Sequence, residues 1–192
     1  LLAPASRPLV VPVASNAVSA PAPTERFRPR KRLWAALGLF IAGGASLNAL
    51  AEWRDTHALL INSSESLPNW AFVIHKTATP ARGEYVFFVP PASPLVVRHF
   101  GAKKQMFGKI VYGMPGDLVE HRGADVIVAG KLVAHMKPLT KFGERLVPGP
   151  TGIIPRDCYF VGSPHKDGFD SRYAAIGFAC ANKIVGVGKP IL

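Results

Sequence analysis

The stretch from residue 33 to residue 51 reads LWAALGLFIAGGASLNALA and contains no ionisable side chain. As a helix, these 19 residues would be about 28 Å long, which is close to the roughly 30 Å hydrocarbon core of a bilayer. Trp34 and Trp53 stand near its two ends, where interfacial aromatic side chains are common. We therefore expect one transmembrane helix over 33–51, with a short part of the chain before it and a long part after it.

The short part, residues 1–32, is rich in Pro and Ala and ends in the basic run RFRPRKR. Prolines interrupt helices, so we expect a disordered arm. Lys and Arg beside the N-terminal end of a transmembrane segment favour the cytoplasm for that end. The arm is then cytoplasmic, the anchor lies in the inner membrane, and residues 52–192 form a periplasmic domain. The alternative is a cleaved signal peptide, because Ala49-Leu50-Ala51 resembles a small-x-small cleavage site.

The chain is strongly basic, with a formal net charge of +11 from 23 Lys and Arg against 12 Asp and Glu. Such a balance suits nucleic acid or an anionic membrane as a partner. A nucleic-acid surface would carry its charge on the folded domain, whereas here a dense basic cluster abuts the apolar stretch. We expect a membrane and no nucleic acid; tethering of DNA by the basic arm is the alternative.

The long part contains short apolar runs bounded by Gly, Pro and Asp, as is typical of β-strands. The run 126–133, VIVAGKLV, holds a plausible hairpin tip at Ala129-Gly130. We expect a mainly β fold of antiparallel sheets with one hydrophobic core. The other predicted strands cover 70–75, 84–89, 109–113, 118–121, 159–162 and 184–187.

Several kinds of functional site are excluded by spacing. The six histidines show no i, i+4 pair and no cysteine partner at zinc spacing. The glycines at 113 and 116 lack the Lys-Ser/Thr ending of a phosphate loop, and no G-x-S-x-G elbow is present. We therefore expect neither a metal nor another cofactor.

Three segments remain that carry chemistry together. The first, NSSESLP at 62–68, follows the apolar stretch by about ten residues, and KIVYGMPGD at 109–117 and DSRY at 170–173 come later. In this order they resemble the type I signal peptidase family of Ser–Lys proteases. The spacing Ser66-Leu67-Pro68 is most similar to the conjugative-transfer branch of that family, the TraF-type peptidases that process pilins.

The resemblance implies a role for each matching residue. Ser66 matches the nucleophile and Lys109 the general base. Ser64 matches the serine whose hydroxyl joins the Ser66 backbone N–H in the oxyanion hole, although Ser63 is an alternative. Asp170 and Arg172 match a structural pair that supports the site.

Physical chemistry is compatible with these roles. A serine hydroxyl needs a base to take its proton. The lysine side chain has a reference pKa of about 10.4, so only roughly one lysine in a few thousand is neutral and able to act as that base at pH 7. Burial disfavours the ammonium form and lowers the pKa. Apolar neighbours of Lys109 in the sequence, among them Met106, Phe107, Ile110 and Val111, are expected to form its surroundings.

Two features depart from the family pattern or leave a choice open. Two residues before Asp170 the family commonly has a serine that hydrogen-bonds the catalytic lysine, and here the residue is Gly168. Packing or another hydroxyl must then position Lys109. Cys158 and Cys180 are either joined by a disulfide, as an oxidising periplasm would allow, or are two free thiols.

The resemblance implies a membrane-anchored serine endopeptidase that cleaves an exported precursor such as a conjugative pilin. Some members of the family also join the new ends of the pilin into a ring, and hydrolysis and cyclisation both stay open here. Components of a conjugation or type IV secretion system are the implied partners. The alternatives are a general signal peptidase and a non-catalytic structural component of a secretion channel.

Overall fold

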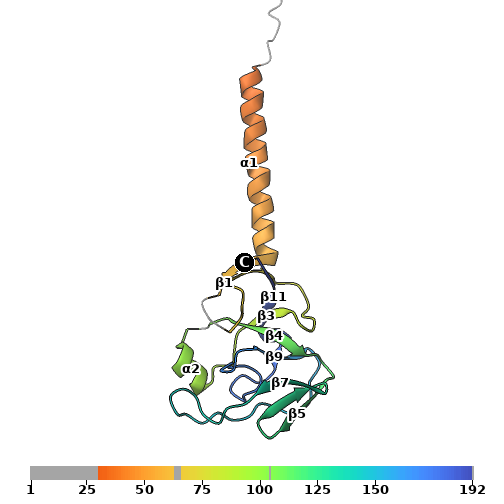
Figure 1. The fold of residues 1–192 in the computed structure, drawn as a ribbon. Coiled ribbons are helices and arrows are strands. Elements are labelled where there is room, and N and C mark those ends of the chain that lie inside the picture. The colour runs from red at the N-terminus through yellow and green to blue at the C-terminus, as the bar shows by residue number, and fades with distance from the viewer. Residues whose placement is uncertain (1–29, 63–65, 104, 192) are drawn as a thin grey trace, which may run out of the picture. The chain divides into compact units, whose positions relative to one another are not determined.

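The computed structural model describes residues 30–62, 66–103 and 105–191, and its first element is helix α1 (Lys31–Thr56; Figure 1). No side chain of α1 is buried, and by length and composition the helix is apolar enough to cross a membrane. It begins two residues before the predicted span and ends five residues after it. The predicted arm lies outside the described residues up to position 29. The described residues divide into two compact units between Gly43 and Gly44.

The second unit is built on two antiparallel sheets, which confirms the predicted mainly β fold. The larger sheet has seven strands in the order β1-β2-β11-β3-β4-β9-β10. Its strands are β1 (His57–Ile61), β2 (Ala71–His75), β11 (Ile184–Pro190), β3 (Tyr85–Phe88), β4 (Phe107–Gly113), β9 (Cys158–Gly162) and β10 (Ala179–Cys180). The central strand β3 lies between the last strand of the chain and β4, so the sheet joins segments far apart in sequence (Figure 1).

The smaller sheet has four strands in the order β7-β6-β5-β8. They are β7 (Lys131–His135), β6 (Asp125–Val128), β5 (Leu118–Arg122) and β8 (Gly152–Ile153). Strands β6 and β7 form a hairpin whose two tip residues, Ala129 and Gly130, have φ of 47° and 76°. A two-residue hairpin turn of type I′ requires positive φ at both of its central residues. The predicted run 126–133 is thus two strands that turn at the predicted tip.

Two short helices were not expected from the sequence. Helix α2 (Pro94–Phe100) starts after Ser93, whose side chain accepts a hydrogen bond from the Val96 N–H. Proline at the first helical position and glycine after the last one are the usual start and stop signals. With seven residues, α2 is too short to display a helical period. A 3₁₀ turn, η1 (Ala181–Lys183), precedes β11.

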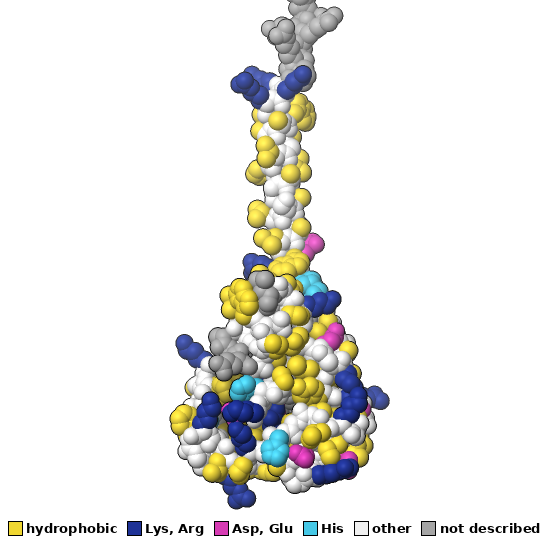
Figure 2. Space-filling view, viewed as in Figure 1, with side chains coloured by type: hydrophobic (Ala, Val, Ile, Leu, Met, Phe, Trp, Pro, Cys, Tyr) yellow, Lys and Arg dark blue, Asp and Glu magenta, His cyan; other side chains and the backbone are white. Residues whose placement is uncertain are grey.

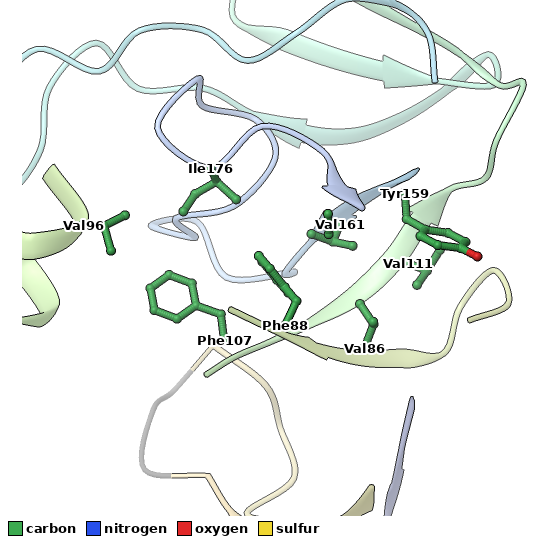
Figure 3. Packing of buried hydrophobic residues seen from close by; sticks show 9 residues of the cluster. Val86, Phe88, Val96, Phe107, Val111, Tyr159, Val161 and Ile176 are labelled. Atoms are coloured by element: carbon green, nitrogen blue, oxygen red, sulfur yellow. The ribbon is translucent and has the colours of Figure 1, made fainter. Parts of the chain in front are cut away.

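The main hydrophobic core lies on one face of β3, β4 and β9 (Figure 3). Strand β4 alternates strictly, with its odd-numbered residues buried and its even-numbered residues half-buried. Val86 and Phe88 of β3 and Val161 of β9 pack on the same side as Phe107 and Val111. Because side chains alternate along a strand, Lys109 projects into this apolar face.

A disulfide joins Cys158 to Cys180. The two residues are directly opposite each other on the paired strands β9 and β10. The two alternatives left open by the sequence are thereby decided in favour of the bond. It closes a loop of 22 residues, which corresponds to about 3 kcal/mol of stabilisation by loop closure.

Candidate active site

A cleft of about 690 Å3 lies in the second unit, and Ser66 and Lys109 both line it. The two residues are 43 positions apart in the chain. They reach the same cleft because Ser66 lies in the loop between β1 and β2, while Lys109 lies on β4. Tyr173 of the DSRY segment lines the cleft as well, together with Gly168 and Phe169 just before that segment. The fold therefore assembles parts of all three motifs at one cavity.

Lys109 is almost completely buried, with 5% of its surface exposed. Its direct cross-strand neighbour on β3 is Val86, and its neighbours on the same face of β4 are Phe107 and Val111. Among the described residues, no hydrogen bond or salt bridge is made by its amine. Burial in these apolar surroundings lowers the pKa of Lys109, and this effect is larger than the opposing attraction of Asp170.

The loop that carries Ser66 is held against β4 by polar and apolar contacts. The side-chain amide of Asn62 donates hydrogen bonds to the carbonyl oxygens of Leu67 and Asn69, at 3.4 and 3.0 Å. Leu67 is buried, and its Cδ1 atom would lie 3.0 Å from a Cβ atom at Gly108. The residue after Ser66 thus packs on the residue before Lys109, and this contact needs glycine at 108.

Asp170 and Arg172 form a fully buried, bidentate ion pair. Arg172 donates from Nε to Oδ1 of Asp170 at 2.8 Å and from Nη2 to Oδ2 at 2.9 Å. Nη2 also donates to the carbonyl oxygen of Ser163 at 2.9 Å, and Nη1 donates to that of His135 at 3.3 Å. The backbone N–H of Ser163 donates to Asp170 at 3.0 Å. The pair ties the end of β9 to the DSRY segment, and its predicted role as a structural support stays a prediction.

The predicted oxyanion residue Ser64 lies outside the described residues, together with Ser63 and Glu65. Its role therefore stays a prediction. No group of three His, Cys, Asp or Glu side chains that could hold a metal ion occurs in the described part of the chain.

Sequence reasoning missed the far part of the cleft, which is lined by Phe142, Lys137 and His165 among others. Phe142 stacks on His99 with 5.2 Å between ring centroids. Lys137 and Lys166 form ion pairs with Asp167, and these pairs lower the pKa of that carboxyl. No local sequence pattern predicts that these residues line the cleft, because they come together there only through the fold of the 136–147 segment.

Sequence reasoning also missed Ser163, the residue that directly follows β9. It is 1% exposed, and its Oγ atom would lie 2.4 Å from a Cβ atom at Gly168. The hydroxyl of Ser163 thus stands where a side chain at 168 would begin. The only available signal was the glycine itself, at a place where a hydroxyl was expected.

A comparison with protein-family models agrees with the family resemblance. A family model described as "Signal peptidase, peptidase S26" matches residues 32–192. A protein described as a probable conjugal transfer protein TraF from Sinorhizobium fredii is 28% identical over 174 residues, covering 81% of this chain and 88% of the relative. The crystal structure of a signal peptidase I from Enterococcus faecalis is 22% identical, covers 57% of this chain and 97% of that one, and has a TM-score of 0.36.

Proposed function

The chain belongs to the signal peptidase family, peptidase S26, and we propose that it is a membrane-anchored serine endopeptidase with Ser66 as nucleophile and Lys109 as general base. The observation that carries this proposal is that both side chains line one cleft while the lysine is withdrawn from water. A lysine can act as a base only when its amine is neutral. Burial of Lys109 lowers the pKa of its amine and so favours the neutral form.

The reaction follows from these two groups. Neutral Nζ of Lys109 takes the proton of Ser66 Oγ while Oγ bonds to the scissile carbonyl carbon. When the C–N bond of the substrate breaks, Lys109 gives the proton to the departing amine. The acyl group of the substrate then remains on Ser66 as an ester. Water then releases the acyl group in hydrolysis, whereas an amino group of the precursor itself releases it in cyclisation. Lys109 accepts a proton from either nucleophile and passes it to Ser66 Oγ as the ester bond breaks, which restores the neutral amine and the serine hydroxyl.

The tetrahedral intermediate carries a negative oxygen that needs donors. The Ser66 backbone N–H and the Ser64 hydroxyl are the proposed pair. One such donor contributes about 3–4 kcal/mol of transition-state stabilisation in a serine protease. Asp170 and Arg172 make no chemical step; they hold the segment beside Lys109.

The anchor and its orientation explain how the enzyme meets its substrate. Helix α1 carries lysine and arginine at its N-terminal end and apolar side chains along its length (Figure 2), which supports a cytoplasmic N-terminus. The domain after it is then periplasmic, where a disulfide such as Cys158–Cys180 persists. Confining enzyme and precursor to one membrane raises their effective concentration.

We propose an exported precursor, such as a conjugative pilin, as the substrate. The resemblance of the NSSESLP segment and the relationship to a protein described as conjugal transfer protein TraF support this choice. A conjugation or type IV secretion apparatus is then the expected setting.

The test uses the full-length protein in membranes together with a conjugative pilin precursor. Ser66→Ala and Lys109→Met should each abolish cleavage, while Lys131→Met, at the exposed tip of the β6–β7 hairpin, should cleave as the unchanged protein does. Retained cleavage in either dyad variant would refute the proposal. Mass spectrometry of the product then separates the two fates, because a cyclic product is lighter than the linear one by one water.

A further inference from the structure

We propose that Ser163 is the residue that positions Lys109, by accepting a hydrogen bond from the lysine amine and donating one to Asp170. This inference rests on the proposed function, because it concerns how the proposed base is oriented. It takes up the question raised by Gly168, where the expected orienting hydroxyl is missing. Four observations lead to it, namely strand register, space, electrostatics and the commitments of the other buried hydroxyls.

Strand register places Ser163 beside Lys109. Strands β4 and β9 are antiparallel, with Ile110 opposite Gly162 and Val111 opposite Val161. Continued one residue beyond the end of β9, this register pairs Lys109 with Ser163. Directly opposite residues have Cβ atoms about 5 Å apart and project from the same face. The hydroxyl therefore stands in the same row as the amine, on the side of Lys109 away from Val86.

Space at Gly168 is what allows the hydroxyl to stand there. A Cβ atom at residue 168 would lie 2.4 Å from Ser163 Oγ, and 2.8 Å from both Asp170 Oδ2 and Arg172 Nη2. Any side chain at 168 would therefore displace the Ser163 hydroxyl. Gly168 also lines the cleft together with Lys109. The Ser163 hydroxyl therefore occupies the space beside the cleft that a side chain at residue 168 would need.

The electrostatic surroundings suit a bridge from Lys109 to Asp170. The backbone of Ser163 is fixed on both sides, because its N–H donates to Asp170 and its carbonyl accepts from Arg172. Its Oγ atom lies 3.5 Å from Asp170 Oδ2, and a hydroxyl that donates in that direction keeps its lone pairs for the amine. Asp170 is close enough to act on the charge of Lys109. Catalytic hydrogen bonds often tighten only once substrate is bound.

The other buried hydroxyls near this corner are committed elsewhere. Ser171 Oγ accepts the N–H of Val161 at 3.0 Å. The hydroxyl of Tyr173 accepts the N–H of Lys137 at 2.9 Å. Each of these two hydroxyls is thus turned toward a backbone N–H, whereas Ser163 faces Lys109 by register.

The experiment compares three variants of the full-length protein in membranes, with kcat and KM measured across pH. Ser163→Ala should lower kcat by about 10- to 100-fold, the effect of a small misplacement of a catalytic group, with KM unchanged. Loss of an acceptor for the ammonium also lowers the pKa of Lys109, so the acid limb of the kcat profile should move to lower pH. A merely structural role would not move that limb.

The other two variants move the hydroxyl instead of removing it. Gly168→Ser alone should be impaired, because its side chain collides with Ser163 Oγ. Combined with Ser163→Ala, the same change loses its collision with Ser163 Oγ but keeps its close approach to Asp170 and Arg172, and activity should exceed that of Gly168→Ser alone. A double variant no better than Gly168→Ser alone would overturn the proposal, as would an unchanged rate and pH profile for Ser163→Ala.

A measurement on the unaltered chain covers the case of a poorly folded variant. With a peptide-like inhibitor bound covalently to Ser66, a crystal structure should show Ser163 Oγ about 3 Å from Lys109 Nζ. A separation that admits another atom between them would overturn the positioning role. If Lys109→Met still cleaves, the proposed function itself fails; if only the Ser163 variants behave like the unchanged protein, this inference alone fails.

Discussion

Replacing Arg172 by methionine tests how the buried ion pair supports the site. Arg172 is 2% exposed and Asp170 is fully buried. Methionine is similar in length but cannot donate, so the change removes two hydrogen bonds to Asp170 and those to the carbonyl oxygens of Ser163 and His135. The carboxyl of Asp170 keeps its bond from the Ser163 N–H but loses its counter-charge.

The expected cost follows from that uncompensated carboxylate. Removing one partner of a buried, hydrogen-bonded pair costs about 3–5 kcal/mol of unfolding free energy. For a domain of this size, such a loss lowers Tm by about 6–20 °C. Asp170→Asn combined with Arg172→Met removes both charges, and it should regain more than about 1 kcal/mol over Arg172→Met alone because no buried charge is left unpaired.

The same variant should also change the pH dependence of cleavage. Arg172 lowers the pKa of Lys109 and Asp170 raises it, so removing only the arginine raises the pKa of the lysine. A smaller fraction of the amine is then neutral at a given pH, and the acid limb of the rate profile moves to higher pH. In the double variant both influences are gone, and the limb should move back.

Urea unfolding followed by circular dichroism measures the free energy of unfolding of each variant. The rate of precursor cleavage across pH measures the position of the acid limb. A loss below about 1 kcal/mol for Arg172→Met, the size of an exposed ion pair, would refute the reasoning about burial. A double variant as unstable as the single one would show that the cost came from lost packing and not from charge.

Three further predictions concern neighbouring parts of the domain. In the unchanged protein, the cleavage rate should rise with pH through the lowered pKa of Lys109 and level off above it; a flat profile across that range would exclude the lysine as base. Gly108→Ala should cost about 1–3 kcal/mol by overpacking, because its Cβ would lie 2.6 Å from a Phe87 ring carbon and 3.0 Å from Leu67, and thermal unfolding should show this together with reduced cleavage. Replacing Cys158 and Cys180 by alanine should lower stability by about 3 kcal/mol, read from urea unfolding with and without reductant; equal midpoints for the variant and the oxidised protein would contradict it.

The local features and the order of the motifs can be predicted from the amino acids alone. An uncharged apolar run predicts the helix, and the pair Ala129-Gly130 predicts the hairpin, because backbone φ and apolar length are properties of a few adjacent residues. The family was recognisable for the same reason: the serine, lysine and DSRY segments are short and stand in a fixed order. The Ser66 and Lys109 assignments came from that recognition.

The surroundings of those residues are a product of the folded domain. The register of β3, β4 and β9 places Lys109 in an apolar row, whereas its sequence neighbour Ile110 lies on the other face of β4 and Met106 precedes that strand. Strand register and burial depend on partners far away in the chain, so no local pattern encodes them. The pKa of a lysine is set by what excludes water from it, and that is a property of the folded domain.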